Sequence, residues 1–352
     1  MLDLTSSLFL GLHHSSDELG GWATLTTGRA AALGEPDLAR RVAARVAANQ
    51  RAVAGVVHRS ALHALVDVVD VLAPTAVVVD AHAYPLAGLA AGSAAARRGA
   101  TVRTFAHHDV GDARRVLTGT GARRPVLVTD GWCVGCNRPA PLAELERVVL
   151  AHGGTLVVDD TQAYGVLGHR SGHGGFGLDG GGTWRWSGGR PVSAVQVVSL
   201  AKGLGAPVAV TTGPRALVGQ LTTHGTRWHS SAPTSADLLA ADRATAPRLR
   251  DELAGRRRRL WSVVQALRDG LRRLGLRVAG LPFPLVHVRA PSVDPVRLVH
   301  GLGALGIRGL ALAPACHPAP TLTFALRADL TDRDVHRVLA ALREVLAQEV
   351  AA

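Results

Sequence analysis

The stretch VVSLAKGLGAPVAV, from Val197 to Val210, contains Lys202, the only lysine of the chain. Of the 39 basic Lys and Arg residues, the other 38 are arginines. A guanidinium stays protonated, whereas a desolvated lysine amine can act as a nucleophile and form an imine. Lys202 follows an apolar run that ends at Ser199 and stands beside a glycine. A lysine retained here, in a chain that otherwise uses arginine, indicates a chemical role rather than a surface role.

The apolar runs around this stretch predict an α/β fold. Short buried strands are expected at residues 76–81, 125–131, 155–160, 194–200 and 207–212. Helical patterns such as residues 140–154 lie between some of these runs, and this alternation favours a mostly parallel sheet with helices on both faces. Several runs end in a polar residue, namely Asp80, Thr129, Asp159 and Ser199. Ligands bind beyond the carboxyl ends of such strands, so these side chains are expected to converge on one site.

The length and the hydrophobic content set the domain organisation. With 352 residues, of which 47% are hydrophobic, the chain can bury a large core and a smaller second one. We expect an N-terminal segment at 1–45, a large domain at 46–240 and a small C-terminal α+β domain at 241–352. The last helix is expected to begin with a capping box formed by Thr331 and Asp334. The glycine-rich segment 168–191 has the composition of a long surface loop.

Composition also argues against several classes of protein. No apolar run is long enough to span a membrane, and no secretory leader pattern is present, so we predict a cytoplasmic protein with no membrane partner. Three cysteines cannot form a fully paired disulfide framework. The net charge of +12 comes from arginines spread along the chain, and aromatic residues make up only 4% of it. The dense run Arg256 to Arg259 opens an amphipathic stretch and is interpreted as the solvated face of a helix, so no nucleic-acid partner is predicted.

The residues near Lys202 suit a phosphate-bearing aldehyde cofactor. The Ser199 hydroxyl can hold a phosphate while the Lys202 amine forms an imine. Asp159, at the end of an earlier strand, can hydrogen-bond a protonated pyridine nitrogen and so make the ring an electron sink. Tyr84 is an aromatic residue that can lie on a flat ring. Each of these signals is weak when it is taken alone.

A resemblance makes the interpretation specific. The chain resembles pyridoxal-5′-phosphate (PLP) enzymes of fold type I, and within them the α-oxoamine synthases, such as 8-amino-7-oxononanoate synthase, and the class I/II aminotransferases. The blocks match in order: LTSSLFLGL (4–12), Asp80 to Tyr84, TFAHHDV (104–110), VTDGWCVGCNRPAPLAEL (128–145), VVDDTQAYGVLG (157–168), SLAKGLG (199–205) and WHSSAPTSA (228–236). The lysine loop is also similar to that of threonine aldolases. The match runs from about residue 4 to about residue 240, with a weaker tail.

The resemblance implies a PLP site and a role for each matching residue. Lys202 would form the internal imine and shuttle protons, Asp159 would hold the ring nitrogen, and Tyr84 would stack on the ring. Gln162 stands at the place of a family histidine and would donate to the ring oxygen. The phosphate would be held by Ser199 and by the helix N-terminus at Ser60 and Ala61. In the family, the segment at Ser230 and Ser231 reaches the phosphate across a dimer interface, which implies a homodimer with a shared active site.

Substrate recognition departs from the family. The family's arginines that bind the amino-acid carboxylate align with Thr321 and Thr323. Arg327 is an even number of residues further along and would point to the same face of an extended strand, so it is the candidate replacement. Ser7, in the first matching block, is the other candidate for substrate binding. The family serine at the ring oxygen is replaced by Val134.

The implied activity is a transferase acting on an amine or amino acid through an external aldimine. It would be either acyl transfer with decarboxylation, from an acyl thioester, or transamination. The residues leave an aldolase-type carbon–carbon lyase open, and also a binding or scaffold protein that has lost catalysis. The motif Cys133-Val-Gly-Cys136 has the spacing of metal or redox sites, but no second pair follows it, so the sequence predicts no metal site.

Overall fold

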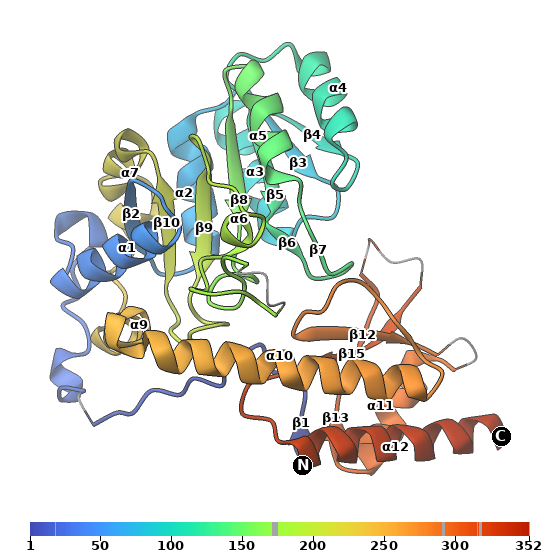
Figure 1. Ribbon diagram of the computed structural model, residues 1–352. Coiled ribbons are helices and arrows are strands. Elements are labelled where there is room, and N and C mark those ends of the chain that lie inside the picture. The colour runs from blue at the N-terminus through green and yellow to red at the C-terminus, as the bar shows by residue number, and fades with distance from the viewer. Residues whose placement is uncertain (18, 171–174, 291–292, 315, 317–318, 352) are drawn as a thin grey trace. The chain divides into compact units, whose positions relative to one another are not determined.

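The structure is a computed structural model that describes residues 1–17, 19–170, 175–290, 293–314, 316 and 319–351 (Figure 1). The chain divides into two compact units. The larger unit comprises His13–Trp132 and Pro139–Arg250, and the smaller one comprises Met1–Leu12, Cys133–Arg138 and Asp251–Ala352. The sequence put the last boundary after residue 240, whereas the structure divides at the first turn of α10 (Arg250–Arg273). The segment expected over 1–45 is shared between the two units.

The larger unit is built on a seven-stranded sheet of order β2-β10-β9-β8-β5-β3-β4. From β9 to β4 the neighbouring strands are parallel, whereas β10 runs antiparallel to both β9 and β2. Its strands are β2 (Ala54–His58), β3 (Ala76–Asp80), β4 (Thr101–Phe105), β5 (Val126–Asp130), β8 (Thr155–Asp159), β9 (Val195–Ser199) and β10 (Ala209–Gly213). The predicted α/β class with a mostly parallel sheet is therefore confirmed.

Helices cover both faces of this sheet (Figure 1). Val77 and Val79 of β3 pack on one face with α2 (Ala61–Leu72), α3 (Pro85–Arg98) and α7 (Arg215–Thr222). Val78 packs on the opposite face with α4 (Val110–Thr120) and α5 (Leu142–Ala151). The alternation of side chains along each strand thus feeds two separate apolar cores. The unit's other helices are α1 (Asp37–Asn49), α6 (Thr183–Trp186), α8 (Thr226–His229) and α9 (Ser235–Thr245).

The glycine-rich segment 168–191 is not the surface loop that its composition suggested. It contains α6, and Trp184 is almost fully buried. Its glycines serve close packing: a Cβ on Gly168 would lie 1.4 Å from the carbonyl oxygen of Leu178, and one on Gly182 would lie 1.9 Å from Asp160 Oδ2. Residues 171–174 lie outside the described part of the chain.

The smaller unit is α+β, as predicted. Its four-stranded antiparallel sheet has the order β11-β12-β15-β14, and β1 (Leu2–Asp3) pairs in parallel with β13 (Ile307–Arg308). The sheet strands are β11 (Arg277–Val278), β12 (Leu285–Arg289), β14 (Leu310–Leu312) and β15 (Thr321–Ala325), and the helices with α10 are α11 (Pro295–Ala304) and α12 (Asp332–Ala351). The capping box of α12 is confirmed, because Thr331 and Asp334 each accept the other's backbone N–H. The short strands β6 (Trp132–Cys133) and β7 (Arg138–Pro139) pair with each other.

The arginine run in α10 is more than a solvated helix face. Arg257 is buried, and Arg256 donates to the carbonyl oxygens of Leu10 and Gly11 at 3.0 and 2.8 Å. Arg259 donates to the carbonyl oxygen of Leu330 at 2.7 Å. These guanidiniums join chain segments that are distant in sequence, a use that helical periodicity cannot reveal. Among the described helices, none combines the length and the apolar character that a bilayer crossing requires.

Candidate active site

A cavity of about 160 Å³ lies in the larger unit, where β5, β8 and β9 end. Apolar cavities of about 150 Å³ accommodate a benzene ring, so this one has the size for a six-membered ring. Its walls are formed by Ala61, Tyr84, Leu86, Asp130, Asp159, Thr161, Gln162, Ser199 and Lys202. Of the four strand-end residues that were expected to converge on one site, Asp159 and Ser199 line this cavity, whereas Asp80 and Thr129 do not.

Lys202 places its amine in this cavity. Its Nζ lies 5.4 Å from the centroid of the Tyr84 ring. Burial lowers the pKa of Lys202 below its usual range, and the negative charges of Asp159 and Asp130 partly oppose that shift. A lowered pKa raises the fraction of neutral amine, which is the nucleophilic form of lysine.

Tyr84 is held in place by Asp130, a site residue that the sequence analysis missed. The backbone N–H of Tyr84 donates to both carboxylate oxygens of Asp130, at 3.1 and 3.0 Å. Asp130 is the register partner of Asp159 on the neighbouring strand. Burial, followed by the charge of Asp159, raises the pKa of Asp130 well above its ordinary value. The sequence interpretation stopped at Thr129, whose hydroxyl donates to Asp80 instead.

Two adjacent aspartates have different surroundings. Asp159 lines the cavity, and its Oδ1 accepts the backbone N–H of Thr161 at 3.0 Å. Asp160 accepts the backbone N–H and the hydroxyl of Thr183 at 2.8 and 2.6 Å. Burial raises the pKa of both carboxyls, that of Asp160 to about 7. This is the alternation expected along a strand, and it leaves Asp159 as the carboxyl at the cavity.

Thr161 and Gln162 complete this wall. The Thr161 hydroxyl accepts the backbone N–H of Ser199 at 3.1 Å, which ties the end of β9 to the segment after β8. Gln162 presents its amide to the cavity, and in the described part of the chain its buried Oε1 has no hydrogen-bond partner. A buried polar atom without a partner is costly, so this amide is suited to a polar ligand.

The N-terminus of α2 borders the same cavity through Ala61. Ser60 is the N-cap of this helix, and its Oγ accepts the backbone N–H of His63 at 3.4 Å. A helix N-terminus attracts anions, because its first backbone N–H groups lack partners within the helix and the helix dipole is positive there. The side chain that caps the helix is thus distinct from the residue, Ala61, that lines the cavity.

The remaining candidate residues do not line the cavity. Ser230 Oγ donates to the carbonyl oxygen of Thr226 at 2.8 Å, and Ser231 Oγ accepts from Arg59 at 3.3 Å. Ser7 lies in the smaller unit, where its carbonyl oxygen accepts from Phe9. Arg327 also lies in the smaller unit, where it contacts the carboxylate of Asp329 at 3.0 Å and the carbonyl oxygen of Asp3 at 3.0 Å.

A chain of hydrogen bonds between two threonine hydroxyls and His287 occupies the positions that align with the family's arginines. Thr321 and Thr323 are fully buried in β15, and their hydroxyls lie 3.2 Å apart. Thr323 Oγ1 lies 2.8 Å from Nδ1 of His287, and Nε2 of His287 lies 2.5 Å from the carbonyl oxygen of Val134. Since that carbonyl can only accept, Nε2 carries the hydrogen and, in the neutral ring, Nδ1 accepts from the Thr323 hydroxyl.

Asp80 organises a turn next to Tyr84. Its carboxylate accepts the backbone N–H groups of His82 and His108 at 2.9 and 3.1 Å and contacts Nδ1 of His107 at 2.7 Å. The rings of His107 and His108 stack with centroids 3.8 Å apart. Through these contacts both histidines are part of the turn that Asp80 holds.

Residues 31–297 match the family model for aminotransferase class I and II. The 8-amino-7-oxononanoate synthase of Alkalilimnicola ehrlichii is 32% identical over 71% of this chain and 62% of that protein. The enzyme of the same name from Nitrosococcus oceani is 30% identical over 70% of this chain and 64% of that protein. The chain thus spans somewhat less than two thirds of the length of these two relatives.

A solved structure agrees with this result at the level of the fold. The serine palmitoyltransferase of Sphingomonas wittichii superposes with a TM-score of 0.80 over 99% of this chain and 88% of that one, at 18% sequence identity. At this identity the likeness establishes the shared fold and nothing further. The predicted PLP-transferase fold is confirmed.

Proposed function

Because the chain belongs to the aminotransferase class I and II family, we propose that it is a PLP-dependent transferase of the α-oxoamine synthase type. It would join an acyl group, delivered as a thioester, to the α-carbon of an amine or amino-acid substrate, with release of the free thiol and, from an α-amino acid, of CO₂. The observation that carries this proposal is that the only lysine of the chain lines the ring-sized cavity together with Asp159, Tyr84 and Gln162. When bound, PLP supplies an aldehyde for the amine and a ring that accepts the electrons released at the substrate's α-carbon.

The residues present fit this cofactor. The cavity has the size for a six-membered ring, and the Lys202 amine lies over the Tyr84 ring at 5.4 Å. The Gln162 amide, with its unpartnered buried oxygen, would meet the ring hydroxyl, its oxygen and nitrogen being interchangeable by rotation of the amide. The phosphate would lie against the first turn of α2 at Ser60 and Ala61 and against the Ser199 hydroxyl.

Lys202 and Asp159 would divide the proton chemistry. Lys202 would bind the cofactor's aldehyde as the neutral amine, which burial favours. It would also carry a proton to or from the substrate's α-carbon. Asp159 would hold the protonated ring nitrogen. A carboxyl with a burial-raised pKa is stable in its ionised form only beside a cation, and the ring nitrogen is such a partner. Asp130 would act as a positioning residue by fixing the backbone of Tyr84.

The active unit would be a homodimer. By the family resemblance, Ser230 and Ser231 reach the phosphate of the partner's cavity, and in this chain neither residue lines its own cavity. Such a shared site needs two chains to be complete.

Cross-dimer complementation between Lys202→Ala and Ser231→Ala chains tests this arrangement. A mixed dimer has one complete site out of two, so pure mixed dimers should recover about half of the wild-type activity, and a randomly mixed preparation should recover about a quarter.

Substrate recognition would differ from that of simple amino-acid enzymes. A carboxylate in a desolvated site needs a charged, bidentate donor, and the aligned positions hold the neutral Thr321 and Thr323. We therefore assign Ser7 and Arg327 only a secondary role and expect the natural amine to bind without a strong carboxylate contact.

The test uses the purified, PLP-loaded protein. Borohydride reduction followed by peptide mass spectrometry should place the cofactor on Lys202. Incubation with acyl thioesters and a panel of amino acids should release free thiol and CO₂ in equal amounts, whereas an amine without a carboxylate should release free thiol alone. Conversion of the cofactor to its amine form without thiol release would indicate transamination instead, and aldehyde release from β-hydroxy amino acids would indicate a lyase. A protein that takes up no PLP would be a scaffold, and the proposal would be wrong.

A further inference from the structure

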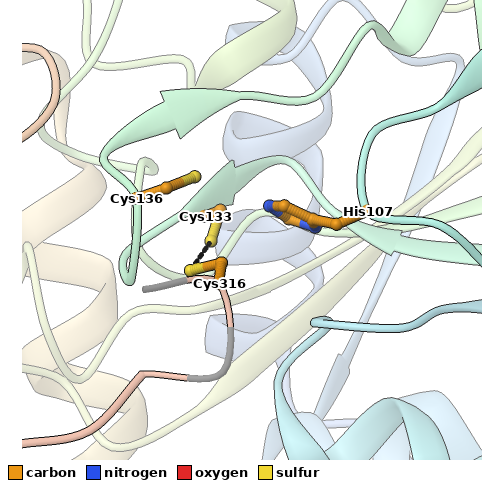
Figure 2. A group of neighbouring side chains, drawn as sticks. All are labelled: His107, Cys133, Cys136 and Cys316. Atoms are coloured by element: carbon orange, nitrogen blue, oxygen red, sulfur yellow. Dashed lines mark hydrogen bonds between the residues drawn. The ribbon is translucent and has the colours of Figure 1, made fainter. Parts of the chain in front are cut away.

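All three cysteines of the chain meet within the smaller unit. Cys133 is the first and Cys136 the last residue of the Cys-Val-Gly-Cys motif. Cys316 follows Cys133 by 183 residues and lies between β14 and β15 in the sequence. Their sulfur atoms all lie within 4.8 Å of one another (Figure 2). The sequence analysis rejected a metal site because no second pair follows the motif, and the fold supplies the missing third thiol.

The spacing of the sulfurs matches a shared metal ion. Cys133 Sγ and Cys316 Sγ are 3.6 Å apart. Two sulfurs bound at about 2.3 Å to one tetrahedral zinc ion lie about 3.8 Å apart, whereas disulfide sulfurs lie about 2.0 Å apart. The observed distance is close to the first value and far from the second.

The backbone around the motif is shaped for the third thiol. A Cβ on Gly135 would lie 2.4 Å from Cys316 Sγ and 2.9 Å from Pro314 Cβ, so only glycine at this position admits the Cys316 side chain. The motif is also held firmly, because Asn137 Nδ2 donates to the carbonyl oxygen of Leu285 at 2.7 Å. A preformed arrangement of ligands lowers the cost of ordering them when a metal binds.

The three thiols lie together beside the Arg138 guanidinium, which contacts Cys136. Cys133 and Cys136 are buried and Cys316 is half-buried. Three thiolates in such a site would repel one another, and a divalent cation between them removes this repulsion.

We infer that Cys133, Cys136 and Cys316 bind a thiophilic divalent metal ion of the zinc class. Binding would release the thiol protons to solvent and form three metal–sulfur bonds, leaving one position of a tetrahedral ion for a ligand from outside this set. The ion would clip the Cys133–Arg138 segment to the β14–β15 loop. Figure 2 also draws His107, which belongs to the larger unit and contacts Asp80 there. The proposed donor set consists of the three thiols alone and is independent of the PLP chemistry.

The first experiment measures metal content and coordination. The full-length chain, freed of any tag and reduced under anaerobic conditions, is dialysed against Zn²⁺ and then against metal-free buffer. We expect about one zinc per chain by elemental analysis. Replacement with Co²⁺ should give a thiolate-to-metal charge-transfer band and the visible bands of tetrahedral cobalt. Bound zinc should protect all three cysteines from alkylation, as read by peptide mass spectrometry, and this readout needs no variant.

Matched variants test the geometry. We expect zinc affinity to fall at least about 100-fold in each of the variants Cys133→Ser, Cys136→Ser and Cys316→Ser. Loss of a residue that only hydrogen-bonds a metal ligand already lowers metal affinity about 10–100-fold. Gly135→Ala keeps all three thiols and should weaken binding at least about 10-fold, whereas Gly303→Ala, where a Cβ meets nothing within 4 Å, should have no effect. The exposed His336 provides the control for surface binding, and His336→Ala should bind zinc like the wild type. PLP uptake serves as the check that each variant is folded.

Three results would overturn the inference. The first is three freely titratable thiols with less than about a tenth of an equivalent of zinc. The second is unchanged zinc affinity in Cys316→Ser. The third is a loss of 2 Da in the intact mass of protein purified anaerobically, which would identify two of the cysteines as a disulfide pair rather than as metal ligands.

Discussion

The cavity of the larger unit keeps most residue types of the family pattern, whereas strand β15 of the smaller unit departs from that pattern. In the cavity, the chain places an amine, a carboxyl, an aromatic ring and an amide together at the end of a parallel sheet. In β15, the two aligned arginine positions are threonines, which join His287 in a chain of hydrogen bonds. The residues proposed to hold the cofactor thus follow the family pattern, whereas the positions aligned with its substrate-binding arginines depart from it.

The largest expected effect is that of Lys202→Arg. This change keeps the positive charge but removes the only side-chain primary amine, so turnover should fall by about 10⁴-fold, the upper range for loss of a general acid–base group. The measurement is single-turnover acyl transfer by PLP-loaded protein. Lys202 would be a binding group rather than a catalytic one if the variant retained more than a tenth of the wild-type rate.

Asp159→Asn should have the next largest effect. The amide cannot stabilise a protonated ring nitrogen, so turnover should fall by about 10²- to 10³-fold while PLP still binds. Asp160→Asn is the matched control, since its carboxyl contacts Thr183 and does not line the cavity; it should change turnover less than about threefold. The opposite ranking would mean that the strand register assigned to the cofactor is wrong by one residue.

A spectral titration probes the altered β15 positions. Alanine, glycine and serine should bind no more than about tenfold more tightly than the matching decarboxylated amines, because neutral threonine hydroxyls make weaker contacts to a carboxylate than arginine does. Arg327→Ala provides the control, because this arginine already contacts Asp329. Tight binding of plain amino acids that survives Arg327→Ala would contradict this expectation.

The smallest effect concerns stability. Thr323→Val removes the hydroxyl that contacts Nδ1 of His287 and leaves a buried ring nitrogen without that partner. The expected loss is about 1–3 kcal/mol in the free energy of unfolding, with little change in PLP binding. Denaturant unfolding measures the loss, and Thr321→Val, which removes the weaker 3.2 Å contact, should cost less.

Local patterns predicted the large sheet, Lys202, Asp159, Ser199 and Tyr84, whereas Gln162 and Ala61 were expected only from the family resemblance. The short uninterrupted apolar runs are typical of buried parallel strands. Because neighbouring side chains on a strand point to opposite faces, Asp159 could be told apart from Asp160, which binds Thr183. Asp130 escaped notice because the end of β5 lies one residue beyond the expected polar position, Thr129. That single residue decides which side chain reaches the cavity.

Other features depend on contacts between segments far apart in the chain, which no local pattern records. The glycines of 168–191 suggested an exposed loop, yet Gly168 and Gly182 are required for close backbone packing. Likewise, the burial of Arg257 and the approach of Cys316 to the Cys133 motif arise only when the smaller unit folds. For such features the sequence supplies the residue types but not the partners.

The single lysine also makes this chain unusually simple to label. Every amine-directed reagent has at most two targets, the α-amino group and Lys202, and the second is partly buried at the cavity. Reductive methylation followed by digestion would therefore report on one peptide, with no background from surface lysines. The degree of methylation at Lys202 becomes a direct gauge of how much of a preparation has its cavity filled.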